Sequence, residues 1–403
     1  MKSQRHVSDK NILQDPQRFS LVQGGPLYQL LCRMKLSDDV LSFLHRRVLV
    51  ILSLCWLPLL LLSALEGRLA GGSVTLPFLW DADFHIRFLV SLPLLIAAEL
   101  TVHRRMMPMT GHFLARGLVP DTAREQFNAA MASALRLRNS MLAEVLMIAL
   151  VYGFGITVVW PQYVALDATT WYSPLSAEGA SLSLAGKWFA YVSLPIFQFL
   201  LLRWYFRLFI WARFLLQVSR IDLSIIPTHP DGVGGLGFFG SLPITFSPLL
   251  MAQGALLAGL IANRIFYRGA VLPDFMVEAA LVVLFHACIM FGPLLVFTPQ
   301  LERARRKGVG EYGALAARYT REFDAKWLRG GAPETEPLIG SSDIQSLADI
   351  GNSFGVVRTM RIVVFTKEAI LQLAVLTIFP VFPLVLTMMP LEELLKKLFD
   401  LLF

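Results

Sequence analysis

Reactive side chains gather in one glycine-rich loop in the middle of the chain, at residues 221–241. Thr228, His229 and Asp231 place a hydroxyl, an imidazole and a carboxylate within four positions. Pro227 and Pro230 prevent a helix from continuing through them. Glycine lets the backbone turn sharply or lie close to a bound group. The glycines of this loop are Gly232, Gly234, Gly235, Gly237 and Gly240.

This glycine loop suits more than one kind of chemistry. His229 and Asp231 could act as an acid–base pair or bind a metal ion, although two ligands are too few for a metal site. The glycines match G-x-G-x-x-G, but a helix rather than a strand precedes them, so a nucleotide fold is not expected. Successive backbone N–H groups ahead of a helix attract anions. The other interpretation is a rigid turn in which Asp231 or Thr228 binds the local backbone.

A second group of candidates consists of charged residues inside apolar runs, where each charge is costly in lipid. They are Glu99, Glu144, Arg203, Arg207, Lys367 and Glu368. All lie about one turn from the predicted cytoplasmic end of a span, and Arg203 and Arg207 share a helix face. They are either boundary charges that snorkel or pair, or the lining of a polar vestibule at the inner leaflet. The vestibule hypothesis takes its lining from the second, third, fourth and seventh spans.

The vestibule hypothesis joins the two groups of residues. The loop at 227–240 carries few charges and several apolar residues, so we expect it to dip into the membrane and cap the vestibule. The predicted ligand-binding residues are then His229, Asp231, Gly232, Gly234, Gly235, Arg203, Arg207, Glu99 and Glu144. No catalytic residue is assigned, and neither a metal nor a cofactor is predicted.

Composition indicates the class of protein that must position these residues. Hydrophobic residues make up 55% of the chain and charged residues 16%, whereas a soluble protein averages about 25% charged. The mean hydropathy is +0.59 and the net charge is +7. The basic residues lie in loops on one side of the predicted membrane, so nucleic acid is not an expected partner. The three cysteines show neither a disulfide framework nor metal-ligand spacing.

Long apolar runs predict an all-α, polytopic transmembrane bundle of about seven spans with cytoplasmic amphipathic helices. The runs are 48–65, 85–102, 141–160, 188–219, 242–262, 275–298 and 369–389. Residues 1–47 form a cytoplasmic N-terminal segment. The bundle covers 48–298 and includes a cytoplasmic helical segment at 103–139 and the glycine loop at 221–241. A second cytoplasmic helical segment covers 299–368, and 369–403 holds the last span and an interfacial tail.

Local patterns predict how several of these elements begin and pack. Phe127, Met131 and Leu135 form one apolar stripe on a helix that we expect to run directly into the third span. Small residues repeat every four positions from Gly254 in the fifth span, which favours close helix contact. The sequence from Ser342 fits a capping box that opens a helix.

The distribution of basic residues predicts the orientation in the membrane. Most of the 36 lysines and arginines fall in 1–47, 103–139, 203–241 and 299–361. The side with more basic loops is cytoplasmic. We therefore expect a cytoplasmic N-terminus and a periplasmic C-terminus. Pro380 and Pro383 allow an alternative topology, in which the last span is a hairpin that returns to the cytoplasm.

Two motifs resemble those of a known family. They are the His-Pro-Asp-Gly-Val-Gly-Gly-Leu-Gly run from His229 and the Ser-Ser-Asp-Ile-Gln-Ser-Leu-Ala-Asp-Ile-Gly-Asn-Ser-Phe run from Ser341. The chain resembles an uncharacterised family of bacterial polytopic inner-membrane proteins. The resemblance implies the inner membrane as the location and implies no substrate or mechanism.

Three classes of function fit the sequence. The first is a protein that moves or senses a small ion or solute through the polar vestibule. The second is a membrane-embedded enzyme acting on a lipid or phosphate ester, for which the sequence shows no obvious nucleophile. The third is a membrane scaffold with no catalytic activity. The lipid bilayer is the expected partner, and the sequence is also compatible with a homo-oligomer.

Overall fold

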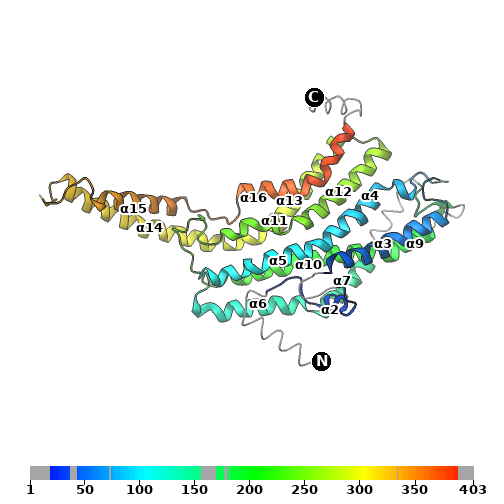
Figure 1. The fold of residues 1–403 in the computed structure, drawn as a ribbon, viewed down its shortest axis with the longest axis horizontal. Helices are drawn as coiled ribbons and strands as arrows, with labels where there is room; N and C mark the ends of the chain where they lie inside the picture. Colours follow the sequence, from blue (N-terminus) through cyan, green and yellow to red (C-terminus); the bar gives the residue numbers. More distant parts are fainter. Residues whose placement is uncertain are drawn as a thin grey trace.

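The computed structural model describes residues 19–36, 43–71, 74–155, 169–176, 179–180, 182–333 and 335–388. Long helices form a bundle, and a pair of helices extends from one end of it as an arm (Figure 1). Within the described ranges the strands are β1 (Leu175–Ser176) and β2 (Gly179–Ala180), which pair antiparallel, and an isolated parallel bridge joins Leu76 and Thr170. The predicted helical fold class is therefore confirmed.

Five helical runs are long and apolar enough to cross a membrane. They are α3 (Leu44–Leu65), Ala82–Ala115, α12 (Ser247–Arg268), Leu272–Leu328 and Lys367–Met388. These runs coincide with the first, second, fifth, sixth and seventh predicted spans. The third and fourth predicted spans correspond to α7 (Met141–Phe154) and α10 (Leu194–Val218), which are not among the five. Several apolar helices thus support an integral membrane protein.

Two of the long helices contain a wide π-helical turn just before a proline. The run Ala82–Ala115 consists of α4 (Ala82–His85), the π segment η3 (Ile86–Ser91) and α5 (Leu92–Ala115), in which Pro93 follows the π segment. The fourth helix repeats this order with α9 (Leu184–Trp188), η6 (Phe189–Ser193) and Pro195 of α10. Proline lacks an N–H group and its ring clashes with the preceding turn, so the helix widens there without breaking.

The helices α5 and α10 lie side by side at the centre of the bundle (Figure 1). The indole Nε1 of Trp204 donates a hydrogen bond to the carbonyl of Leu95 at 2.9 Å, and both residues are buried. A buried indole N–H that lacked this partner would be destabilising. This bond therefore fixes the register between the segments of α5 and α10 that carry the predicted charges.

A shorter helix, α6 (Arg124–Arg138), packs along α10. Phe127, Met131 and Leu135 are buried, which confirms the predicted apolar stripe. The prediction that this helix runs directly into the third span is wrong, because α6 ends at Arg138 and Asn139 is its C-cap. Ser140 then caps α7, and its hydroxyl accepts the N–H of Ala143 at 3.3 Å.

Close approach of backbones explains the small residues of α12. A methyl group on Gly254 would lie 1.9 Å from the carbonyl oxygen of Thr377 in α16 (Lys367–Ile378). Only glycine permits this contact, so the predicted small-residue stripe is confirmed there. α16 continues as the 3₁₀ segment η11 (Phe379–Met388) through Pro380 and Pro383. The last span shows no turn back up to Met388, and the predicted tail lies outside the described residues.

The sixth predicted span leads without interruption into the arm. It comprises η8 (Leu272–Phe275), α13 (Met276–Phe291) and η9 (Gly292–Phe297), followed by α14 (Thr298–Phe323) and η10 (Asp324–Leu328). α15 (Ser342–Thr359) packs back along α14. The predicted capping box of Ser342 and Gln345 is wrong, because the helix is capped by Ser341, whose hydroxyl accepts the N–H of Asp343 at 3.1 Å.

Candidate functional site

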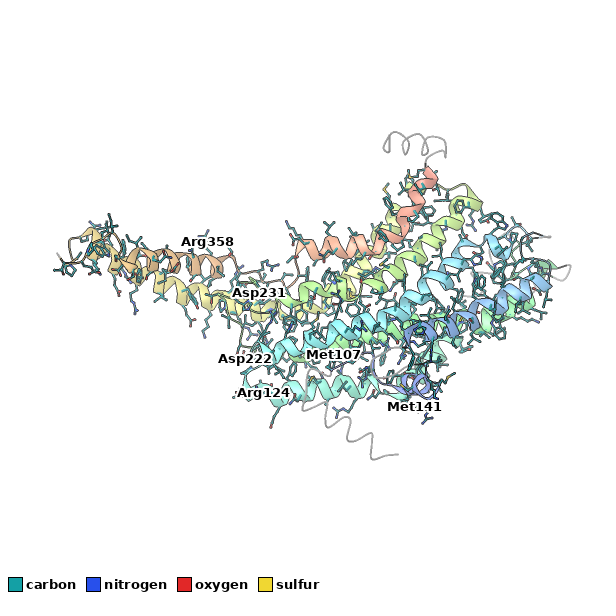
Figure 2. All side chains as sticks on the ribbon, viewed as in Figure 1. Met107, Arg124, Met141, Asp222, Asp231 and Arg358 are labelled. Carbon is teal, nitrogen blue, oxygen red and sulfur yellow. The ribbon has the colours of Figure 1, made fainter. Side chains whose placement is uncertain are left out.

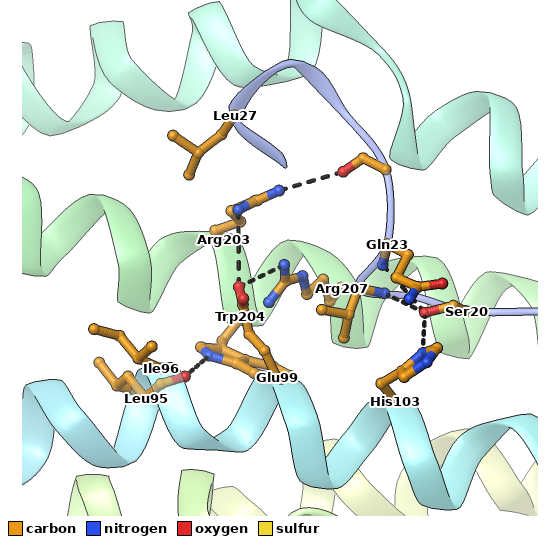
Figure 3. Close-up of polar contacts among 12 residues, drawn as sticks. Ser20, Gln23, Leu27, Leu95, Ile96, Glu99, His103, Arg203, Trp204 and Arg207 are labelled. Carbon is orange, nitrogen blue, oxygen red and sulfur yellow. Dashed lines mark hydrogen bonds and ion pairs between the residues drawn. The ribbon is translucent and has the colours of Figure 1, made fainter. Parts of the chain in front are cut away.

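Five charged side chains meet inside the bundle, and we call them the charge cluster. They are Arg47 of α3, Glu99 of α5, Glu144 of α7, and Arg203 and Arg207 of α10; Figure 3 shows the α5 and α10 members. Their exposed fractions lie between 3% and 8%. Four of them were predicted from the sequence, and the structure brings all four together.

Glu99 is the centre of the charge cluster. Its Oε1 lies 2.8 Å from Nη2 of Arg207 and 3.8 Å from Nη1 of Arg203. Its Oε2 accepts a hydrogen bond from Nη2 of Arg47. Arg203 also lies 3.6 Å from Oε1 of Glu144. One carboxylate thus holds three guanidinium groups from two other helices.

The N-terminal segment closes the cluster on one side, which the sequence did not predict. The N–H of Leu27 donates to Oε2 of Glu144 at 2.9 Å, and the carbonyl of Gly24 accepts from Arg203 at 3.4 Å. The N–H of Gly25 donates to Asn139 at 3.0 Å. Phe19 and Leu21 are buried in the core. This segment leads into α2 (Pro26–Arg33), which contacts α7.

The charge cluster carries three guanidinium groups and two carboxylates, and therefore a net charge of +1. A buried charge without a counter-charge is strongly destabilising. The guanidinium of Arg207 lies 4.7 Å from the ring centre of Trp204, and this cation–π contact offsets part of the cost. In the described part of the chain no further carboxylate contacts these three arginines, so one positive charge of the cluster lacks a counter-charge there.

A cavity of about 490 Å³ begins at the charge cluster. We call it the lateral cavity. Arg47, Glu99 and Arg203 line one end of it, and no other charged side chain is among its described lining residues. Its apolar walls come from α2, α3, α5, α7 and α10. They include Leu30, Met34, Val50, Leu54, Ile96, Ile148, Tyr152, Pro195 and Phe199.

The glycine loop forms a compact structure around the side chain of Asp231. Its Oδ1 accepts the N–H groups of Val233 at 2.9 Å and Gly235 at 3.1 Å, and its Oδ2 accepts that of Gly237 at 2.8 Å. Burial raises the pKa of the Asp231 carboxyl, but these three donors and nearby His229 lower it further, so the net pKa lies below its ordinary value. The amides expected to attract an external anion are therefore occupied by the loop's own carboxylate.

His229 completes this arrangement at the surface of the loop. Its Nδ1 lies 2.9 Å from Oδ1 of Asp231, and its side chain is 29% exposed. Arg361, which follows α15, donates its backbone N–H to the carbonyl of Gly232 at 2.8 Å and its Nη2 to the carbonyl of Asp231 at 3.1 Å. The loop lies where the arm joins the bundle, as the position of Asp231 in Figure 2 shows. These contacts favour the rigid-turn interpretation.

The structure separates the glycine loop from the charge cluster. Val218, at the end of α10, is eleven positions further along the helix than Arg207, which is a distance of roughly 16 Å. Among the described residues, no hydrogen bond or ion pair links His229 or Asp231 to the cluster. The nine residues predicted to share one vestibule thus belong to two separate places.

The lining of the cluster also differs from the prediction. Lys367 and Glu368 of the seventh predicted span begin α16, which packs on α12 and α13 and not on the cluster. The first span supplies Arg47 instead. The available sequence signal was its position, because Arg47 is the last basic residue before the first apolar run. A charge at that boundary is equally compatible with a position in the membrane headgroups, so only its spatial neighbours identify it.

Comparisons with known proteins identify no relative: no family model, no curated protein and no solved structure matches the chain. Within the described part of the chain, no group of three His, Cys, Asp or Glu side chains has the arrangement to hold a metal ion. The charge cluster with its lateral cavity is therefore the candidate site, and its chemistry must be inferred from its own geometry.

Proposed function

We propose that the chain is a seven-span protein of the bacterial inner membrane that binds an anion at the charge cluster and moves or senses it. The five apolar helical runs support the membrane location. α7 and α10 supply the other two spans in this proposal, since both pack within the same bundle. The N-terminus is cytoplasmic and the C-terminus periplasmic, as the distribution of basic residues favours.

The observation that supports this proposal is the excess of one buried positive charge. Arginine presents a planar set of N–H donors that matches phosphate and carboxylate groups. Among the described residues, Arg203 has only long polar contacts, at 3.4 Å to the carbonyl of Gly24, 3.6 Å to Glu144 and 3.8 Å to Glu99. It is therefore the guanidinium most open to an incoming anion. An anion bound there would compete with Gly24 and so connect binding to the position of the N-terminal segment.

The enzyme alternative has less support from the geometry. Its proposed acid–base pair, His229 and Asp231, lies in the glycine loop and apart from the lateral cavity. The carboxylate of Asp231 already accepts three backbone N–H groups, so it is a poor acceptor for a substrate proton. The charge cluster contains arginines and paired carboxylates but no candidate nucleophile.

The proposal predicts that Arg203→Gln abolishes stabilisation by anions without unfolding the protein. The variant leaves two guanidinium groups and two carboxylates, so the cluster becomes neutral. Arg213→Gln is the control, because Arg213 lies on the same helix outside the cluster. Purified protein in detergent is titrated with sodium sulfate, and its Tm is measured against sodium chloride of equal ionic strength.

The Tm of wild type and of Arg213→Gln should rise with sulfate and then saturate. The Tm of Arg203→Gln should show only the non-specific effect of salt. A ligand at about 100 times its Kd contributes about 2.7 kcal/mol, which a thermal transition resolves readily. An equal sulfate response in all three proteins would refute anion binding at the cluster.

A further inference from the structure

We propose that the anion is the headgroup of a membrane lipid whose acyl chain lies in the lateral cavity. This inference rests on the proposed function and specifies its ligand. A volume of about 490 Å³ falls within the range of about 300–1,000 Å³ typical of ligand pockets. A small inorganic anion would occupy only the charged end and would leave the apolar walls without a partner.

The lateral cavity has the polarity of a lipid molecule. On α3 its lining runs from Arg47 to Leu54, and on α10 from Arg203 back to Pro195. At 1.5 Å per residue these stretches are roughly 10 and 12 Å long. Both begin at the charges and lead away from the side of the membrane where basic loops gather. A lipid of the cytoplasmic leaflet has the same order, with its headgroup at the inner surface and its chain directed toward the bilayer centre.

The lateral cavity also reaches the surface of the bundle. Leu54 of α3 and Ile148 of α7 both line it, and their exposed fractions are 45% and 46%. On a membrane-spanning surface such side chains face lipid. An acyl chain can therefore enter sideways from the bilayer, without passing through water. Leu30 of α2 and Met34, which follows that helix, line the cavity as well and would contact the same chain.

Charge complementarity selects the class of lipid. Counted over the residues that the structure describes, the cluster has one positive charge in excess, which matches a headgroup of one net negative charge such as a phosphodiester. A zwitterionic lipid would bring its own cation into a site that already has an excess of arginine. We therefore expect phosphatidylglycerol to bind in preference to phosphatidylcholine.

The test measures the Tm of the full-length protein in detergent micelles with increasing phosphatidylglycerol or phosphatidylcholine. Arg203→Gln removes the headgroup contact. Leu54→Trp fills the cavity and leaves every charge in place, and Ile148→Trp fills it from the opposite wall if the first variant does not fold. Leu61→Trp is the matched control, because Leu61 is a lipid-exposed residue two turns further along α3 and outside the cavity.

Phosphatidylglycerol should stabilise wild type and Leu61→Trp at equal concentrations. Arg203→Gln and the cavity-filling variant should each require at least tenfold more of this lipid. If the cavity-filling variant binds as wild type does while Arg203→Gln does not, the lipid inference is overturned and anion binding stands. Equal effects of the two lipids also overturn it, and the sulfate titration then decides the proposed function. An undiminished response of Arg203→Gln to both lipid and sulfate overturns both proposals.

Discussion

Glu99 is the main counter-charge of the cluster, because three arginines share its carboxylate. Removing that charge would leave three buried guanidinium groups with only Glu144 as a counter-charge. Breaking a buried pair by removing one partner costs about 3–5 kcal/mol. The residue is thus both a structural support for the bundle and the group that limits the net charge of the site to +1.

We expect Glu99→Gln to lower the free energy of unfolding by about 3 kcal/mol or more, because the amide cannot neutralise the arginines. The control is Glu322→Gln on α14, whose side chain is 68% exposed and pairs with Arg318. An exposed pair of this kind contributes about 0–1 kcal/mol. Thermal unfolding in detergent compares the two variants, and similar losses would contradict the central role of Glu99.

At the scale of single elements, the glycine loop is a fixed turn whose glycines have distinct roles. Gly234 has a φ of 65°, and a methyl group there would lie 2.1 Å from Cγ2 of Ile225. Gly240 has no atom within 4 Å of such a methyl group. Of these two glycines, only Gly234 therefore combines a left-handed backbone with a close neighbour.

Gly234→Val should accordingly destabilise the protein by about 1–3 kcal/mol or more, since the backbone strain adds to the steric clash. Gly240→Val should change stability by much less. Protease resistance of the junction between arm and bundle, followed by mass spectrometry of the fragments, measures the effect where it arises. Equal resistance of the two variants would mean that the loop tolerates rearrangement and is not the rigid junction described above.

Some elements could be predicted from sequence because their causes are local. The stripe of Phe127, Met131 and Leu135 follows from helix periodicity, and the loop follows from its prolines and glycines. The end of α6 at Asn139 was missed because a serine can also lie inside a helix. Only the structure shows that the hydroxyl of Ser140 caps a new helix. The capping function of Ser341 was assigned one residue too late for a similar reason, since adjacent serines offer the same hydroxyl.

The candidate site was only half predictable. Glu99, Glu144, Arg203 and Arg207 were recognisable because charges in apolar runs are rare and costly. Their partner Arg47 was not, because the contact joins residues 52 positions apart and no local pattern records it. The sequence placed the charge cluster and the glycine loop together because both were expected at the same depth in the membrane. That expected depth was wrong for the loop, because the loop follows the end of α10, roughly 16 Å along the helix from Arg207.

At the scale of the whole molecule, the number of spans determines which loops share a compartment. Leu184 at the start of α9 and Glu125 in α6 are separated by α7. Seven spans place them on opposite sides of the membrane. A bundle in which neither α7 nor α10 crosses would place them on the same side.

We expect a single cysteine at Leu184 to react with a membrane-impermeant maleimide in intact cells, and a cysteine at Glu125 to react only in inside-out vesicles. Both are introduced into a background with Cys32, Cys55 and Cys288 replaced by serine or alanine. Labelling of both positions from one side would exclude the seven-span arrangement. Reporter fusions at Lys10 and after Phe403 then locate the termini independently.

The docking of the N-terminal segment has a consequence for the order of biosynthesis. The carbonyl of Gly24 meets its partner Arg203 only after a further 179 residues have been added to the chain. Translation proceeds at about 5–20 residues per second, so this interval lasts roughly 9–36 s. During that time Phe19 and its apolar neighbours leave the ribosome without their final contacts. The first described residues of the bundle therefore cannot reach their final contacts until about half of the chain has been made.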